Sequence, residues 1–431
     1  MPLSHSVKEV LLKNGAKGLF VLVPGTTSVY YEVQFRAGNN YALRPDISQV
    51  AHILEHMAFG ANNEYPSIEA FSQEFTKNGA YSNAHTSSTD LSYEAEAGIM
   101  EWDRIMELQR LSVTHPVYTQ KLLDAEKGNV REEITGYANN TSRLLWQEIM
   151  RRAGLNRWYD PEEIKTINTV TLDDITEHYR RTHTTNNMRF IVAGDLEAHM
   201  PELIEQFEEW ELPAGELFPI EIEKAHSTGL VYIQRAEMQN LTFALDFFLN
   251  RTLNRKELRA MNALSHILTD TFHSRIWGAA RSQGLCYGMG SWVSADPTGT
   301  SEFGIGGEVS FDNAHNLFQL ITEQLKIISK YGVSEDELQQ AKQYRLGSLQ
   351  MGLDTVNSLA SWYASIYYET GEIDDVEAFP ALIEGTTVNE MKQLANEFLT
   401  SGIWTFGGIG NILEEDLQQH YDLFANEIMK G

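Results

Sequence analysis

Continuous apolar runs rich in β-branched and aromatic residues open the pattern of this chain. Residues 19–23 and 29–35 are two such runs, separated by a Pro-Gly pair. Runs of this composition around a turn signal predict two β-strands. After a polar loop, residues 51–59 place apolar side chains at helical spacing around His52. We therefore expect a strand pair followed by an amphipathic helix.

The rest of the first half alternates between helical and extended patterns. A staple of Val170 and Ile175 marks the start of a capped helix at Thr171. The other expected elements are a helix after Pro66, a strand at 91–97, a helix ending before Pro116, one long helix from Thr119 towards Arg152, and a strand at 188–194.

The second half repeats features of the first. His266 lies in a Ser-His-Ile-Leu run 214 residues after His52 (266 − 52), which lies in an Ala-His-Ile-Leu run. Thr387 opens a helix 216 residues after Thr171 (387 − 171). Two similar offsets, each near half the chain, predict a duplicated domain. The elements expected in this half are strands at 230–235, 241–249, 292–293 and 301–309, and a helix capped by Ser334 and Glu337.

The predicted fold class is therefore α+β, with two homologous domains, each a mixed or antiparallel sheet covered by helices. A segment with two prolines and a glycine suggests a linker at 213–225, between a first domain at 1–212 and a second at 226–431.

Composition and charge narrow the partners. The chain has 60 Asp and Glu against 33 Lys and Arg, a formal net charge of −27. This charge disfavours nucleic acid and anionic lipid, and it suits basic peptides or metal cations. The sequence has neither an evident secretory signal nor a long apolar run, so we expect a cytoplasmic protein without a membrane span. Cys286 is the single cysteine, which excludes a cysteine-rich zinc site.

Candidate chemistry lies on the helix around His52. In a helix His52 and His56 share a face, one turn apart, and both imidazoles can bind one Zn²⁺. Glu55 borders that face, where it can act as general base towards a zinc-bound water. His-x-x-Glu-His is the inverted zincin pattern. An amphipathic core helix with two hydrogen-bonded histidines is the alternative reading.

Two acids on the long helix strengthen the metal reading. Glu126 and Glu133 follow the spacing of its apolar residues and so share its inward face. Buried acids need a cation or a partner, although two solvated charges are the simpler alternative. Glu133 can complete a set of two imidazoles and one carboxylate. Glu126 can accept a hydrogen bond from a ligand imidazole.

The chain resembles the inverted-motif zinc peptidases that include pitrilysin, insulin-degrading enzyme and mitochondrial processing peptidase. The resemblance rests on residues 52–59 (HILEHMAF), 79–86 (GAYSNAHT) and 126–133 (EKGNVREE). It implies one Zn²⁺ per chain held by His52, His56 and Glu133, with Glu126 behind a ligand. It also implies that Asn83 and Ala84 form an edge that aligns substrate main chain by β-addition.

A further segment of the second half, 274–287 (SRIWGAARSQGLCY), resembles the family's Arg and Tyr that reach back to the scissile carbonyl. The matching residues are Arg281 and Tyr287, and the stretch between them is one residue shorter than is usual in the family. Thr269 and Asp270 stand where the first copy has Glu55 and His56, so the second domain is expected to be inactive.

The resulting prediction is a zinc-dependent endopeptidase that hydrolyses short or unfolded peptides in an enclosed chamber, with Glu55, Tyr287 and Arg281 as catalytic residues. The resemblance implies that two chains pair, with a homodimer favoured and a heterodimer as the alternative. The competing functions are a non-catalytic structural or partner subunit of the same fold, and a zinc hydrolase of a non-peptide bond.

Overall fold

The protein is represented by a computed structural model that describes residues 3–155 and 159–428. Among these residues, no helix is long and apolar enough to cross a membrane. The chain divides into two compact units. The first comprises Met1–Gly136, Asp160–Pro219 and Leu349–Val376; the second comprises Tyr137–Tyr159, Ile220–Ser348 and Glu377–Gly431.

The first unit contains a six-stranded sheet in the order β1-β2-β6-β3-β5-β4. Strands β2 and β6 are parallel, and the other neighbours are antiparallel. The strands are β1 (Ser6–Leu11), β2 (Lys17–Leu22), β3 (Ser28–Phe35), β4 (Tyr81–Thr86), β5 (Leu91–Gly98) and β6 (Met188–Gly194).

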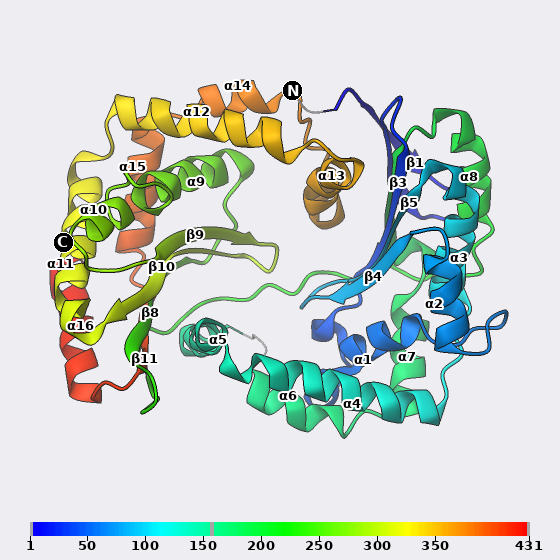
Figure 1. Cartoon of the computed structure of the whole chain (residues 1–431), viewed down its shortest axis with the longest axis horizontal. Helices are drawn as coiled ribbons and strands as arrows, with labels where there is room; N and C mark the ends of the chain where they lie inside the picture. The colour runs from blue at the N-terminus through cyan, green and yellow to red at the C-terminus, as the bar shows by residue number, and fades with distance from the viewer. Residues whose placement is uncertain (1–2, 156–158, 429–431) are drawn as a thin grey trace. The chain divides into compact units, whose positions relative to one another are not determined.

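Helices cover both faces of this sheet. Alternate residues of β3, namely Val29, Tyr31 and Val33, join a core with the helices on one face, and α13 (Val356–Thr370) packs against β3 and β6 on the other (Figure 1). The other helices of the unit are α1 (Val50–Ala58), α2 (Ile68–Thr76), α3 (Trp102–Thr114), α4 (Gln120–Gly136), α6 (Asp160–Ile167), α7 (Leu172–Thr182) and α8 (Met200–Glu208).

The second unit contains a five-stranded sheet in the order β7-β11-β8-β10-β9. Its strands are β7 (Gly229–Gln234), β8 (Asn240–Leu249), β9 (Met289–Asp296), β10 (Thr300–Ser310) and β11 (Trp404–Gly410). Its helices are α5 (Thr141–Ala153), α9 (Arg255–Thr269), α10 (Trp277–Ser282), α11 (Phe311–Tyr331), α14 (Phe379–Glu384), α15 (Val388–Thr400) and α16 (Glu414–Glu427), and α12 (Glu335–Gly352) begins in it.

The two sheets share one pairing pattern, which confirms the predicted fold class. The parallel pair β2–β6 corresponds to β7–β11, and the antiparallel series β6-β3-β5-β4 corresponds to β11-β8-β10-β9. The register agrees in detail. Glu32 of β3 lies opposite Ile191, and Asp246 of β8 lies opposite Thr405, each 214 residues further on.

One helix from each half of the sequence packs in the other compact unit. Leu145 and Ile149 of α5 join Ala244 and Phe248 of β8, whereas Phe243 and Phe247 of that strand face the helices on the opposite side. Helix α13, from the second half, covers the corresponding face of the first sheet. The compact units therefore exchange segments that the linear boundaries at 212 and 226 keep apart.

The predicted long helix from Thr119 to Arg152 was wrong, because it is interrupted. Helix α4 ends at Gly136, a short 3-10 turn follows, and Asn140 caps α5 by accepting a hydrogen bond from the backbone N–H of Arg143. A second N-cap within the run ends the first helix and lets the chain pass into the second unit. The caps at Thr171 and Ser334 are confirmed as capping boxes.

Candidate active site

Helix α1 presents two imidazoles from one face. His52 and His56 are one helical turn apart, and their ring centroids lie 5.0 Å apart. The apolar residues between and around them are buried against the core of the first unit, which leaves the two rings facing α4. A Cβ at Gly60 would stand only 2.7 Å from the side chain of Leu122, so glycine there permits the close approach of α1 and α4.

Helix α4 brings a carboxylate to both rings. Oε2 of Glu133 lies 3.5 Å from Nε2 of His52 and 3.2 Å from Nε2 of His56. One ligand atom from each of the three residues lies within 4.8 Å of the others. Two imidazole nitrogens and one carboxylate oxygen, with Glu133 reaching solvent, are the donor set of a catalytic zinc that keeps its fourth position open. The residues present therefore fit this metal.

Glu126 stands behind His56. Its carboxylate lies 3.3 Å from Nδ1 of His56 and accepts a hydrogen bond from Asn129. Burial raises the pKa of Glu126, but His56 and Asn129 outweigh it, and the net pKa is lowered. Burial likewise lowers the pKa of His56, but Glu126, Glu55 and Glu133 raise it further. This excess of negative charge around two imidazoles favours a bound cation.

His52 has a different partner. Its Nδ1 lies 2.8 Å from Oε1 of Gln49, and Nε2 of Gln49 donates to Glu163 of α6 at 2.9 Å. Gln49 is fully buried at the N-terminus of α1. Both histidines thus turn Nδ1 towards a protein partner and Nε2 towards Glu133.

Glu55 is held by the end of strand β4. The Thr86 hydroxyl donates to Oε2 of Glu55 at 2.6 Å. Burial raises the pKa of Glu55, and the hydrogen bond from Thr86 and the nearby histidines oppose the rise. The carboxylate therefore has a fixed orientation beside the donor set, which a general base needs.

Asn83 and Ala84 lie on β4, the edge strand beyond β5. Their partners on β5 are Glu94 and Tyr93, and no strand among the described residues pairs with the other edge of β4. Ala84 faces the core, whereas Asn83 is exposed. The backbone of β4 can therefore accept an added strand next to Glu55.

The corresponding helix of the second unit, α9, holds no such donor set. His266 stacks on Tyr344 with ring centroids 4.1 Å apart, and its Nδ1 lies 3.2 Å from Asp270. Thr269, at the position of Glu55, is buried and hydrogen-bonds to Ser291 of β9. The second copy keeps the helix and has replaced the general base and one imidazole.

Arg281 and Tyr287 are in the second unit and contact each other. The Arg281 guanidinium lies 4.1 Å from the centroid of the Tyr287 ring and donates to the Tyr287 carbonyl at 3.0 Å. The indole N–H of Trp277 donates to the same carbonyl. The Tyr287 side chain is held by its backbone and stacking while 84% of its surface is exposed.

Three polar residues of the site were absent from the sequence prediction: Gln49, Thr86 and Glu163. Gln49 precedes His52 by three positions, a spacing that brings helical side chains together and could have indicated the contact. Thr86 lies in a segment that the family resemblance covers. Glu163 comes from a separate helix, and no local spacing indicates it.

The duplicated fold, with one complete and one incomplete donor set, is that of a two-domain metallopeptidase. Residues 22–158 match the sequence profile described as Insulinase (Peptidase family M16), and residues 169–344 match Peptidase M16 inactive domain. The chain belongs to this family.

Individual relatives are distant. A protein named uncharacterized zinc protease YmxG from Bacillus subtilis is 22% identical over 360 residues, which cover 82% of this chain and 86% of that protein. The probable zinc protease PqqL from Escherichia coli is 24% identical over 71% of this chain and 34% of its own length. A protease from Helicobacter pylori has the same fold, with a TM-score of 0.80, 19% identity and coverage of 95% and 100%.

Proposed function

We propose that this chain is a zinc-dependent endopeptidase acting on short or unfolded peptides. The observation that carries the proposal is the convergence of His52, His56 and Glu133 within 4.8 Å. Glu55 is hydrogen-bonded in place beside them. The names of relatives as zinc proteases support the choice of metal and reaction.

His52, His56 and Glu133 would hold one zinc ion per chain. The bound ion supplies Lewis-acid chemistry, polarising a water molecule and the scissile carbonyl. Glu55 takes a proton from the attacking water and gives it to the departing amine. Thr86 holds the Glu55 carboxylate while the proton moves. Glu126 keeps the His56 ring oriented through Nδ1.

The substrate would bind as a strand added to β4. Main-chain hydrogen bonds at the edge around Asn83 and Ala84 are independent of side chains, which suits a peptidase of broad specificity. An added strand requires an extended segment, so a short or unfolded peptide is the form that fits. The net charge of −27 favours basic peptides among these substrates.

Tyr287 and Arg281 are proposed to act on the scissile carbonyl. The Tyr287 hydroxyl can donate to the developing oxyanion, and Arg281, stacked on its ring, holds it. Removing one oxyanion donor typically costs about 100-fold or more in kcat. We expect a loss of this order in Tyr287→Phe, with the zinc content unchanged.

The central test uses zinc-loaded protein and a mixed pool of oligopeptides followed by mass spectrometry. Wild type should cleave the pool, and chelation should abolish cleavage until zinc is restored. Glu55→Gln should bind zinc and leave the pool intact. Glu132→Gln, which removes an exposed carboxylate next to Glu133, is the matched control and should cleave normally. Normal cleavage by Glu55→Gln would contradict the proposal.

The assembly and location follow from the same proposal. Two chains would pair to enclose the chamber, a homodimer before a heterodimer, in the cytoplasm. Gel filtration of the purified chain with light scattering measures the pairing directly, and a mass of one chain at assay concentrations would contradict it.

A further inference from the structure

Gln49 is a polar side chain buried without exposure, and both ends of its amide are used. The carbonyl oxygen Oε1 lies 2.8 Å from Nδ1 of His52, and the amide nitrogen Nε2 lies 2.9 Å from Oε2 of Glu163. A buried amide would be costly without partners. Here it bridges a ligand imidazole and a carboxylate on another helix.

The chemistry of these groups fixes the direction of each hydrogen bond. An ionised carboxylate only accepts, so the side of Gln49 facing Glu163 must be the NH₂ group. The carbonyl oxygen of Gln49 therefore faces His52 and can only accept, which places a proton on Nδ1. A neutral imidazole protonated at Nδ1 keeps its lone pair on Nε2. That nitrogen faces Glu133.

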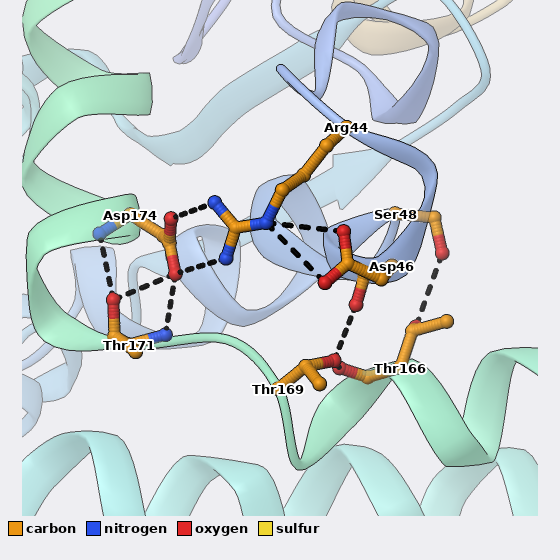
Figure 2. Close-up of polar contacts among 7 residues, drawn as sticks. All are labelled: Arg44, Asp46, Ser48, Thr166, Thr169, Thr171 and Asp174. Atoms are coloured by element: carbon orange, nitrogen blue, oxygen red, sulfur yellow. Dashed lines mark hydrogen bonds and ion pairs between the residues drawn. The ribbon is translucent and has the colours of Figure 1, made fainter.

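The segment before α1 is anchored to the helix that carries Glu163. Figure 2 shows Ser48 next to Thr166, Asp46 next to Thr169, and the Arg44 guanidinium on Asp174. The Ser48 hydroxyl also donates to the Glu163 carboxylate. These contacts hold the 3-10 turn before α1 on α6 and α7.

We propose that Glu163 and Gln49 form a relay that sets the tautomer of His52 and so prepares Nε2 to bind the metal. Gln49 and Glu163 are positioning residues, because neither touches the metal or the substrate. The inference rests on the proposed zinc site and adds to it the origin of the second ligand's orientation, which Glu126 supplies only for His56.

The relay can be reversed in chemistry while every hydrogen bond keeps its direction. In the double variant Gln49→Glu with Glu163→Gln, the new amide at 163 donates to the new carboxylate at 49, which accepts from Nδ1 of His52. The Ser48 hydroxyl can turn to accept the second amide proton. Each single variant breaks this order. Gln49→Glu places two carboxylates together, and Glu163→Gln removes the group that fixes the amide.

The measurement is the zinc dissociation constant, obtained by competition with a chromophoric chelator, on the full chain. Loss of a group that orients a metal ligand typically weakens affinity by about 10- to 100-fold, and we expect this of Gln49→Met. We expect weakening of at least about threefold in each single swap variant, and a return to within about threefold of wild type in the double variant. Glu132→Gln controls for the loss of a nearby exposed carboxylate.

Several results would overturn the relay. They are a dissociation constant for Gln49→Met within about threefold of wild type, or a double variant no tighter than the weaker single variant. If Gln49→Met does not fold, the swap variants carry the test, because they keep size and polarity. Failure of wild type to bind zinc would instead contradict the proposed function. Peptide cleavage by the double variant gives a second readout and should recover together with zinc affinity.

Discussion

A carboxyl group in the middle of the first sheet offers a test of how burial sets the pH dependence of stability. Glu32 of β3 is 6% exposed. The Tyr30 hydroxyl lies 3.0 Å from its carboxylate and 2.9 Å from that of Glu94. Burial raises the pKa of Glu32 to about 7, with the Tyr30 hydrogen bond opposing the rise and Glu94 and Asp90 adding to it. The perturbation is Glu32→Gln.

The sign follows from the raised pKa. The native state holds the Glu32 proton more tightly than the unfolded state, so the native state is at its full stability below pH 4.5. That stability is lost as the pH rises through about 7. The difference between 4.5 and about 7, at about 1.4 kcal/mol for each pKa unit, corresponds to about 3 kcal/mol. Glutamine does not ionise, and its carbonyl oxygen can still accept from Tyr30.

Unfolding by urea, followed by tryptophan fluorescence from pH 5 to pH 8.5, measures this difference. We expect Glu32→Gln to be more stable than wild type by up to about 3 kcal/mol at pH 8.5 and to approach wild type at pH 5. Glu132→Gln controls for the loss of an exposed acid. A difference between Glu32→Gln and wild type that is the same at both pH values would refute the reasoning.

Two other substitutions test single contacts. Thr86→Val should lower kcat by about 10-fold, because the hydrogen bond to the Glu55 carboxylate is lost. Thr86→Ser should restore kcat, and zinc content should not change; equal kcat in Val and Ser variants would contradict the positioning role. Arg275 clasps Glu337 with two hydrogen bonds and lowers its pKa to about 2. This stability is present above pH 4.5 and lost as the pH falls through about 2, so Glu337→Gln should cost about 1 kcal/mol at pH 7, after allowance for solvent screening, and less at pH 3. Chemical unfolding at the two pH values checks this, and an equal cost at both would count against it.

The elements and donor residues that depend on local spacing were readable from the sequence. His52 and His56 are related by one helical turn, and Thr171 is related to its capping partner Asp174 by three positions. The duplication was readable because the two copies keep the same offset between matching strands. Each of these signals lies within one element or repeats along the chain.

The remaining features depend on contacts that local sequence does not specify. The apolar face of α5 predicts that the helix is covered, but it does not say which sheet covers it. The periodicity through α4 and α5 looked continuous, although Asn140 carried the signal for a second start. Glu163 reaches Gln49 from a helix more than a hundred residues along the chain, where its charge looked like an ordinary exposed acid.

The order in which a ribosome makes the chain gives the exchanged helices a further consequence. The face of the first sheet that α13 covers stays bare until residues 356–370 have left the ribosome. In the second sheet, β11 lies between β7 and β8 and is the last strand to be made. The nascent chain therefore carries two incomplete sheets for most of its synthesis. Domains usually fold one after another as they emerge. Here both must wait for the same late segments, and the newly made chain is expected to depend on chaperones.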